Sequence, residues 1–292
     1  MTGETQSRIA IAADGARIAY RSYGRGAPTV LLSNGIGCNQ AYTDHLVRAL
    51  ASRYRTVIWD YRGHVDSDPP SGPEQTSVAA CLRDLEAVVG ELGGGDLVLA
   101  GFSMGVQISL EAYLRLRDRT RGLLLLLGTF EFPLRSFFHA GPLWERIAPG
   151  VLAAGRSWPE ALRASWRTLF AGPWLWPAAR LLVLNAQAAR REDFESWQIH
   201  LSRMAPETFL QMAIHLGQHS AASALPQIDV PCLIVAGDRD NFTPLEVIER
   251  MHARIAGSEL AVIEGASHGG LFEFAEQVNA RVLSFMAEHF DA

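Results

Sequence analysis

The stretch LVLAGFSMGVQ, residues 97–107, places a serine between two glycines directly after an apolar run. The run is typical of a strand buried on both faces, and helical spacing follows it, so the stretch predicts a strand, a sharp turn and a helix. Such a turn can hold the Ser103 hydroxyl in an exposed position, while Gly101 and Gly105 leave room for neighbouring backbone. The alternative interpretation is an ordinary strand–helix turn whose serine caps the helix.

The same alternation of elements surrounds this stretch. Apolar runs predict strands at 28–35, 55–63, 96–102 and 121–128, and helical spacing is found at 41–52, 77–93 and 106–117. Strands that alternate with helices form right-handed βαβ units and a parallel sheet. Upstream of them, RIAIAADG and ARIAYRSYG (8–24) alternate in polarity around a glycine-bearing turn, which predicts an antiparallel hairpin.

The alternation is interrupted once. Residues 129–226 contain no convincing strand and carry six of the seven tryptophans, on amphipathic segments separated by prolines. Alternation then resumes with strands at 230–237 and 258–265 and helices at 244–257 and 270–290. We therefore expect a parallel-sheet core made of residues 1–128 and 227–292, with residues 129–226 inserted as a helical cap.

Composition restricts the possible partners. The chain has 292 residues, a net charge of −5 and three cysteines without a CxxC pair. The charge argues against nucleic acid or an anionic membrane as a partner, and the cysteines suit a reducing compartment. The N-terminal sequence shows no signal peptide and no apolar run approaches 18 residues, so we expect a cytoplasmic protein without a membrane span.

A serine hydroxyl becomes a good nucleophile only when a base takes its proton and a carboxylate orients that base. In a parallel sheet, such groups lie beyond the carboxyl ends of the strands. Asp238 and Asp240 follow one predicted strand, and His268 follows the next. The chain order is therefore Ser, Asp, His, with each residue just past a strand.

Several segments together resemble the α/β-hydrolase superfamily over nearly the whole chain: GFSMG (101–105), GDRDNFTP (237–244), GASH (265–268), DYRGH (60–64) and NGIG (34–37). The resemblance implies an α/β fold with a mostly parallel eight-stranded sheet flanked by helices, and a helical cap inserted after strand six. The wording of the serine motif and the position of the cap are similar to the esterase, cofactor-free haloperoxidase and enol-lactonase branch. No cofactor is implied.

By position, the resemblance makes Ser103 the nucleophile and His268 the general base and later the general acid. Asp240 becomes the orienting acid, because it lies four residues before a proline, as the acid does in similar segments. Asp238, in the same segment, stays an alternative acid. Glu131 is a second alternative, because some branches place the acid after the preceding strand.

An oxyanion hole needs two backbone N–H groups. The resemblance implies those of Met104 and Ile36. The chain departs from the family wording at Asn34, where a histidine is commoner, and at Val65, where a glycine is usual. Residues Asp60, Arg62 and His64 are expected to be structural.

Two histidine patterns could suggest a metal, and we expect none at either. His64, Asp66 and Asp68 form H-x-D-x-D, but two prolines follow and predict a loop. His215 and His219 are four residues apart without the glutamate of an HExxH motif, so a cap-helix face is expected. No glycine-rich dinucleotide fingerprint follows the first buried strand.

These features predict a serine hydrolase that cleaves an ester, thioester or lactone of a largely apolar small molecule through an acyl-enzyme. The expected partner is a small acyl substrate, and the oligomeric state is left open. Carbon–carbon bond hydrolysis or acyl transfer at the same site are alternatives. So is a non-hydrolytic member of the superfamily: a lyase, a cofactor-free oxygenase or a ligand receptor.

Overall fold

A single eight-stranded sheet organises the computed structural model, which describes residues 6–136 and 143–291. The strand order is β1-β2-β4-β3-β5-β6-β7-β8. The strands are β1 (Gln6–Ile11), β2 (Arg17–Tyr23), β3 (Thr29–Ser33), β4 (Thr56–Trp59), β5 (Leu97–Phe102), β6 (Thr120–Leu126), β7 (Cys232–Gly237) and β8 (Glu259–Ile263). β2 pairs antiparallel with β1 and β4, and the other five pairs are parallel. The predicted hairpin and the predicted mostly parallel sheet are confirmed.

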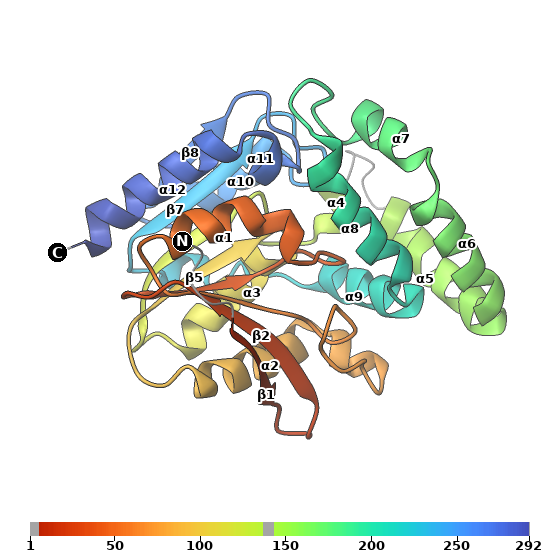
Figure 1. Cartoon of the computed structure of the whole chain (residues 1–292), viewed down its shortest axis with the longest axis horizontal. Coiled ribbons are helices and arrows are strands. Elements are labelled where there is room, and N and C mark those ends of the chain that lie inside the picture. The colour runs from red at the N-terminus through yellow and green to blue at the C-terminus, as the bar shows by residue number, and fades with distance from the viewer. Residues whose placement is uncertain (1–5, 137–142, 292) are drawn as a thin grey trace.

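Helices cover both faces of this sheet (Figure 1). One face carries α2 (Val78–Glu91), α3 (Met104–Arg115) and α10 (Leu245–His252), and the other carries α1 (Asp44–Ala51), α11 (Gly270–Glu273) and α12 (Ala275–Phe290). Short 3-10 helices η1 (Gln40–Thr43) and η2 (Pro73–Thr76) precede α1 and α2. The chain therefore has the layered architecture expected of alternating strands and helices.

The period of two along the central strands divides the core into two clusters. Leu97 and Leu99 of β5 pack with the α2–α3 layer, whereas Val98 and Ala100 pack with the α1–α12 layer. All four side chains are buried, as expected for a strand covered on both faces. Burial of each leucine contributes about 2 kcal/mol, so this double burial holds the carboxyl end of β5 firmly in place.

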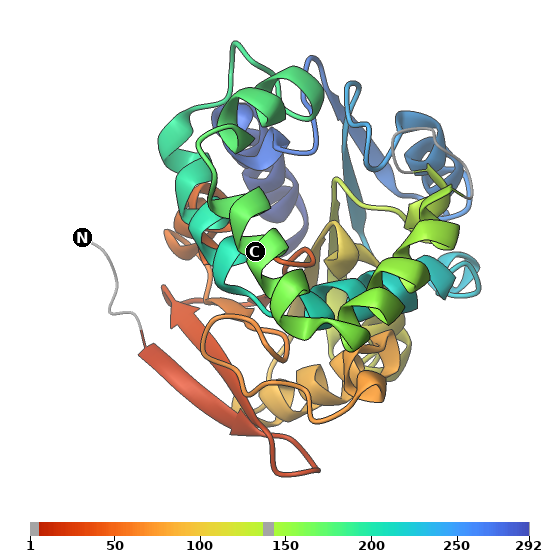
Figure 2. The ribbon, with the colours of Figure 1, turned by 90° about the vertical axis from the view of Figure 1, so that its right-hand side faces the viewer.

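Between β6 and β7 the described residues form helices, and the only strand-like pairing is an isolated bridge from Glu131 to Ser220. The helices are α4 (Pro133–Ser136), α5 (Leu143–Ser157), α6 (Pro159–Ala171), α7 (Leu175–Leu182), α8 (Arg191–Arg203), α9 (Pro206–Gln218) and the 3-10 helix η4 (Leu225–Gln227). Figure 2 shows α5, α6 and α7 as the outermost layer at one end of the molecule. The division into core and cap at 129 and 226 stays a prediction.

Two predicted helices differ from the observed ones. The helix expected at 244–257 ends at His252. The closing helix is divided into α11 and α12, because Phe274 adopts φ −125° and ψ 40°, outside the helical region. Within the described ranges, no helix has both the length and the apolar character needed to cross a membrane.

Candidate active site

Ser103 occupies the turn between β5 and α3 with φ 55° and ψ −115°. A positive φ is strained for a residue other than glycine, and such strain clusters at functional sites. The turn is held because the Ser103 N–H donates to the Leu126 carbonyl of the neighbouring strand at 3.0 Å. The hydroxyl is thereby fixed at the N-terminus of α3, where free N–H groups favour negative charge.

The two flanking glycines are required by close backbone contacts. A Cβ at Gly101 would lie 2.1 Å from the Gly105 carbonyl oxygen, and a Cβ at Gly105 would lie 1.9 Å from the Ser33 carbonyl oxygen. Both distances are far below van der Waals contact, and both partners are backbone atoms that cannot turn aside. The sequence interpretation of a tight strand–turn–helix is therefore explained by sterics.

The structure brings Ser103, His268 and Asp240 together. His268 Nε2 lies 3.0 Å from Ser103 Oγ, and His268 Nδ1 lies 2.8 Å from Asp240 Oδ2. The Asp240 side chain is fully buried, and that of His268 is 12% exposed. The carboxylate accepts the Nδ1–H proton, so the Nε2 lone pair faces the serine hydroxyl.

Asp240 is oriented by its own loop. Its Oδ1 accepts the backbone N–H groups of Phe242 and Thr243 at 2.8 and 3.0 Å, and its Oδ2 accepts the Thr243 hydroxyl at 2.7 Å. The Phe242 ring stacks on the His268 ring with centroids 4.8 Å apart. The carboxylate and the imidazole therefore have little freedom to leave this arrangement.

The two alternative acids face elsewhere. Asp238 Oδ1 accepts the Gly265 N–H at 2.6 Å, which ties the loops after β7 and β8 together. Glu131 pairs with Arg250 at 3.3 Å on the surface. Neither forms a hydrogen bond to His268 among the described residues.

The hydrogen bonds of the loop after β3 bear on the predicted oxyanion donor Ile36. Gly35 N–H donates to Asn34 Oδ1 at 2.9 Å, and Cys38 N–H donates to the Gly35 carbonyl at 3.2 Å. No hydrogen bond to a described residue uses the N–H of Ile36 or of Met104. Those are the two groups that the sequence predicts as oxyanion donors.

Asn34 explains the first departure from the family wording. Its side-chain Nδ2 donates to the Asn39 backbone carbonyl at 2.9 Å. The backbone carbonyl of Asn34 accepts the Tyr61 hydroxyl at 2.7 Å. The side chain bridges the two ends of its loop, so the loop is braced without a histidine.

His64 forms a hydrogen bond to the same loop. Its Nε2 accepts the Gly37 N–H at 2.9 Å, and its Nδ1 lies 3.2 Å from the Arg62 carbonyl, to which it donates. Burial lowers the pKa of His64 to about 4, so the ring is neutral at pH 7. Only the neutral ring can accept the Gly37 proton.

Val65, the second departure, carries a left-handed backbone. Its φ is 41°, a conformation that suits glycine and strains a β-branched residue. The side chain is 46% exposed and lines a hollow of about 720 Å³, which is also lined by Ile199 of α8 and by Met204 directly after that helix. The position thus keeps the geometry that a glycine would adopt.

Glu273 is a positioning residue that the sequence analysis missed. Its buried carboxylate accepts the Ser267 hydroxyl at 2.6 Å, the Ser267 N–H at 3.0 Å and the Asn185 N–H at 2.7 Å. Ser267 directly precedes His268, and Asn185 Nδ2 also donates to the Gly265 carbonyl at 2.9 Å. The one available signal was an acidic residue inside the apolar run GLFEF.

The residues of the first metal-like pattern serve three different partners. His64 accepts from Gly37, Asp66 pairs with Arg21, and Asp68 Oδ2 accepts the Arg17 N–H at 2.8 Å. These contacts brace the loop after β4. In the second pattern, His215 and His219 contact different side chains, those of Thr76 and Gln107.

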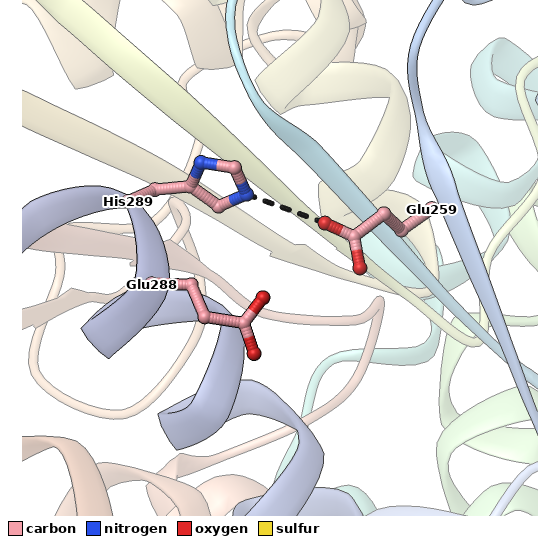
Figure 3. Close-up of side chains that lie close together, drawn as sticks. All are labelled: Glu259, Glu288 and His289. Atoms are coloured by element: carbon pink, nitrogen blue, oxygen red, sulfur yellow. Dashed lines mark hydrogen bonds and ion pairs between the residues drawn. The ribbon is translucent and has the colours of Figure 1, made fainter.

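Glu259, Glu288 and His289 form a group whose potential ligand atoms lie within 4.8 Å of one another (Figure 3). Arg281 pairs with Glu259, and His289 Nε2 lies 3.3 Å from the same carboxylate. The Ser284 hydroxyl donates to Glu288 at 2.8 Å. The group is a surface ion-pair cluster on β8 and α12, away from Ser103.

The sequence profile of the alpha/beta hydrolase family matches residues 30–281, and the chain belongs to this family. The predictions of the superfamily, of its fold and of a hydrolase are confirmed.

Individual proteins of known sequence or structure are also similar to this chain. The chain is 28% identical over 277 residues to a putative carbamate hydrolase, RutD, of Azorhizobium caulinodans, covering 94% of this chain and 96% of the relative. It is 30% identical over 279 residues to the polyketide synthase ThaQ of Burkholderia thailandensis, but spans only 12% of the length of that protein. A thermophilic esterase from Thermogutta terrifontis superposes with a TM-score of 0.78 at 21% identity, covering 97% of this chain and 99% of the esterase.

Proposed function

We propose that this chain hydrolyses a carboxylic ester, thioester or lactone of a largely apolar small molecule through an acyl-enzyme on Ser103. The observation that carries the proposal is the continuous series of hydrogen bonds from Ser103 Oγ to His268 at 3.0 Å and from His268 to Asp240 at 2.8 Å. This arrangement activates a serine hydroxyl by general-base catalysis.

In the first half-reaction, His268 Nε2 takes the Ser103 hydroxyl proton while Oγ attacks the substrate carbonyl carbon. The carbonyl π electrons move to oxygen, and the resulting oxyanion accepts the N–H groups of Ile36 and Met104. When the carbonyl re-forms, the bond to the leaving oxygen or sulfur breaks. The leaving group takes the proton from His268, and the acyl group stays on Ser103.

In the second half-reaction, water gives a proton to His268 Nε2 and its oxygen attacks the acyl carbon. A second oxyanion forms at the same two N–H groups. Its collapse breaks the bond to Ser103 Oγ, which recovers the proton from His268, and the carboxylic acid leaves. Asp240 stabilises the imidazolium in both halves and keeps its own charge.

The helical segment 129–226 supports an apolar substrate and the role of a cap. A Cβ at Gly37 would lie 2.8 Å from the Phe209 ring of α9 and 2.9 Å from Leu201 of α8. These helices therefore pack directly on the loop that supplies the Ile36 N–H. Apolar contacts around a few convergent polar groups are typical of small-molecule sites.

A fluorophosphonate probe tests the assignment. Phosphonylation requires an activated serine, so we expect an added mass on the peptide that contains Ser103, absent in Ser103→Ala and strongly slowed in His268→Ala. Ser284→Ala, which removes an exposed serine of α12, is the matched control and should label as the wild type. A folded wild-type chain that takes up no probe, or that labels equally in His268→Ala, would contradict the proposal.

Turnover separates the hydrolase from its alternatives. A panel of apolar esters, thioesters and lactones should release acid at a rate that depends on Ser103. If an acyl-enzyme forms but water never releases the acid, acyl transfer to another alcohol or amine replaces hydrolysis.

We also propose a reducing compartment such as the cytoplasm. Cys38, Cys81 and Cys232 are free and buried, and burial raises the pKa of each thiol.

A further inference from the structure

The helices α5, α6 and α7 expose large apolar side chains to an unusual extent. Twelve large apolar side chains of the described residues are exposed, and eight of them lie between 143 and 182, on these helices or directly before them. Trp158 is 68% exposed, Trp174 50% and Leu181 83%. Single exposed apolar residues need no explanation, but such a concentration at one end of the molecule does.

On α5 the exposed apolar residues follow one helix face. Leu143, Ile147, Val151 and Ala154 are all exposed, and their spacing places them within about 80° of one another around the helix. Leu152 lies on the opposite face and is buried. The helix therefore has one apolar face packed on the protein and a second one without a partner among the described residues.

The same three helices are electropositive in an acidic protein. Residues 143–182 contain five arginines and two glutamates, a net +3, whereas the whole chain carries −5, so the remainder carries −8. All five arginines are exposed. Arg163 pairs with Glu160 and with Glu207 of α9. No ion pair to a described residue involves Arg146 or Arg167.

We propose that the outer face of α5–α7 docks on an anionic lipid surface. Tryptophan and leucine side chains that enter the interface, with arginines beside them, are the combination that holds peripheral proteins on acidic membranes. Anionic headgroups complement the local +3 and repel the −8 of the remainder, which orients the molecule with this end toward the lipid. The total charge alone had argued against such a partner, because it averages over this asymmetry.

A second copy of the chain is a poorer occupant. A two-fold contact through this face would set +3 against +3, since symmetric dimers bring the same patch together. Like charges across an interface disfavour association. The same argument does not apply to lipid, whose charge is opposite.

Co-sedimentation with vesicles tests the docking without any assay of activity. The full chain is mixed with vesicles of phosphatidylcholine and phosphatidylglycerol in equal parts, or of phosphatidylcholine alone. We expect binding to the mixed vesicles, much weaker binding to the neutral ones, and loss of binding in high salt. The inactive Ser103→Ala variant should bind as the wild type, which separates this proposal from the proposed hydrolysis.

Two variants address the face itself. Trp158→Ser removes a tryptophan that is 68% exposed at the N-cap of α6, a position that favours serine, so the helix is retained. The pair Arg146→Glu and Arg167→Glu reverses the unpaired charge, and each arginine at an acidic surface contributes about a fivefold factor in partitioning. We expect each change to lower the vesicle partition coefficient at least about tenfold.

Matched controls are Ile11→Ser on β1 and Arg83→Glu on α2, which change an exposed isoleucine and an exposed arginine elsewhere. Both should bind as the wild type. A folded chain that ignores mixed vesicles, or α5–α7 variants that bind unchanged, would overturn the proposal. So would a dimer that Trp158→Ser dissociates, which would assign the face to a second copy, or binding to soluble polyglutamate in place of vesicles, which would indicate an acidic protein.

Discussion

His64 Nε2 accepts the backbone N–H of Gly37 at 2.9 Å, and this bond fixes the residue that follows Ile36. The bond spans 27 positions of sequence and connects the loop after β4 with the loop after β3. An imidazole buried to this degree has few alternative partners. We therefore expect the proposed oxyanion donor, the Ile36 N–H, to depend on a hydrogen-bond acceptor at position 64.

Replacing that acceptor should affect the rate more than substrate binding. We expect His64→Leu to lower kcat about tenfold or more, because a mispositioned oxyanion donor weakens the transition state, with little change in KM. His64→Gln keeps an acceptor and should retain most of the rate. The measurement is steady-state hydrolysis of an apolar ester. Equal losses in both variants would show that His64 acts only through packing.

The same residue predicts a pH dependence of stability. Burial lowers the pKa of His64 from 6.5 to about 4, so between these values the unfolded chain binds a proton that the folded chain does not. Stability therefore falls as the pH drops through this window, by about 3 kcal/mol in total. Burial raises the pKa of Asp60 to about 6, so the contribution of Asp60 to stability increases as the pH falls, opposite to that of His64.

Comparison with His64→Gln isolates this contribution, because Asp60 is common to both proteins. Urea unfolding at the two ends of the window should show the wild type losing about 3 kcal/mol relative to the variant as the pH falls. A constant difference would mean that His64 does not titrate in this way.

Val65→Gly should stabilise the protein. Relief of the left-handed strain of a β-branched residue exceeds the entropy that glycine adds to the unfolded chain, so we expect a gain of about 1 kcal/mol. Val262→Gly is the control, because Val262 is comparably exposed, at 44%, but lies in strand β8. That change should destabilise. Thermal unfolding of both variants decides, and a loss of stability in Val65→Gly would contradict the strain.

The acid assignment separates three carboxylates. Asp240→Asn should lower kcat by about 10⁴, because an amide at this position favours the wrong imidazole tautomer. Asp238→Asn and Glu131→Gln should change kcat less than about threefold, since neither side chain contacts His268. Rates measured for all three with one ester give the answer. A large loss in Glu131→Gln with an active Asp240→Asn would transfer the role to Glu131.

Glu273→Gln tests the support of the base. An amide can accept through only one oxygen, and its NH₂ group would face donors on Ser267 or Asn185, so the loop that carries His268 should shift. We expect kcat to fall about tenfold with KM nearly unchanged, and the pH profile of kcat to move with it. Glu276→Gln, an exposed change in the first turn of α12, is the control. Unchanged kinetics in Glu273→Gln would show that Glu273 does not position His268.

Much of this architecture could be predicted because its signals are local. Continuous apolar runs, helical spacing and the turn at Ser103 are each contained in about ten residues, and the strand ends placed Asp240 and His268 at one edge of the sheet. The contacts of Glu273 could not be predicted in this way. Its partner Ser267 lies in the loop before α11, and its partner Asn185 lies in the segment after α7. No local pattern connects positions 185, 267 and 273.

Backbone conformation was equally hidden. Valine in a loop normally takes an extended conformation, so the residue itself does not indicate the positive φ of Val65. The only signal was the glycine that is usual at this position in the family. The exposed apolar face of α5 could not be predicted either. An apolar periodicity predicts an amphipathic helix, but it does not show that the helix has a second apolar face exposed to solvent.

The strained backbone at residue 103 means that the residue needed for the proposed reaction is not the residue that would make the fold most stable. A glycine there would relieve the positive φ and should make the chain more stable while removing the hydroxyl, whereas any side chain at 101 or 105 collides with backbone. In a population of random variants selected only for folding, position 103 should therefore drift away from serine, and its neighbours should not. Persistence of serine under selection for growth would then measure how much the organism depends on the reaction.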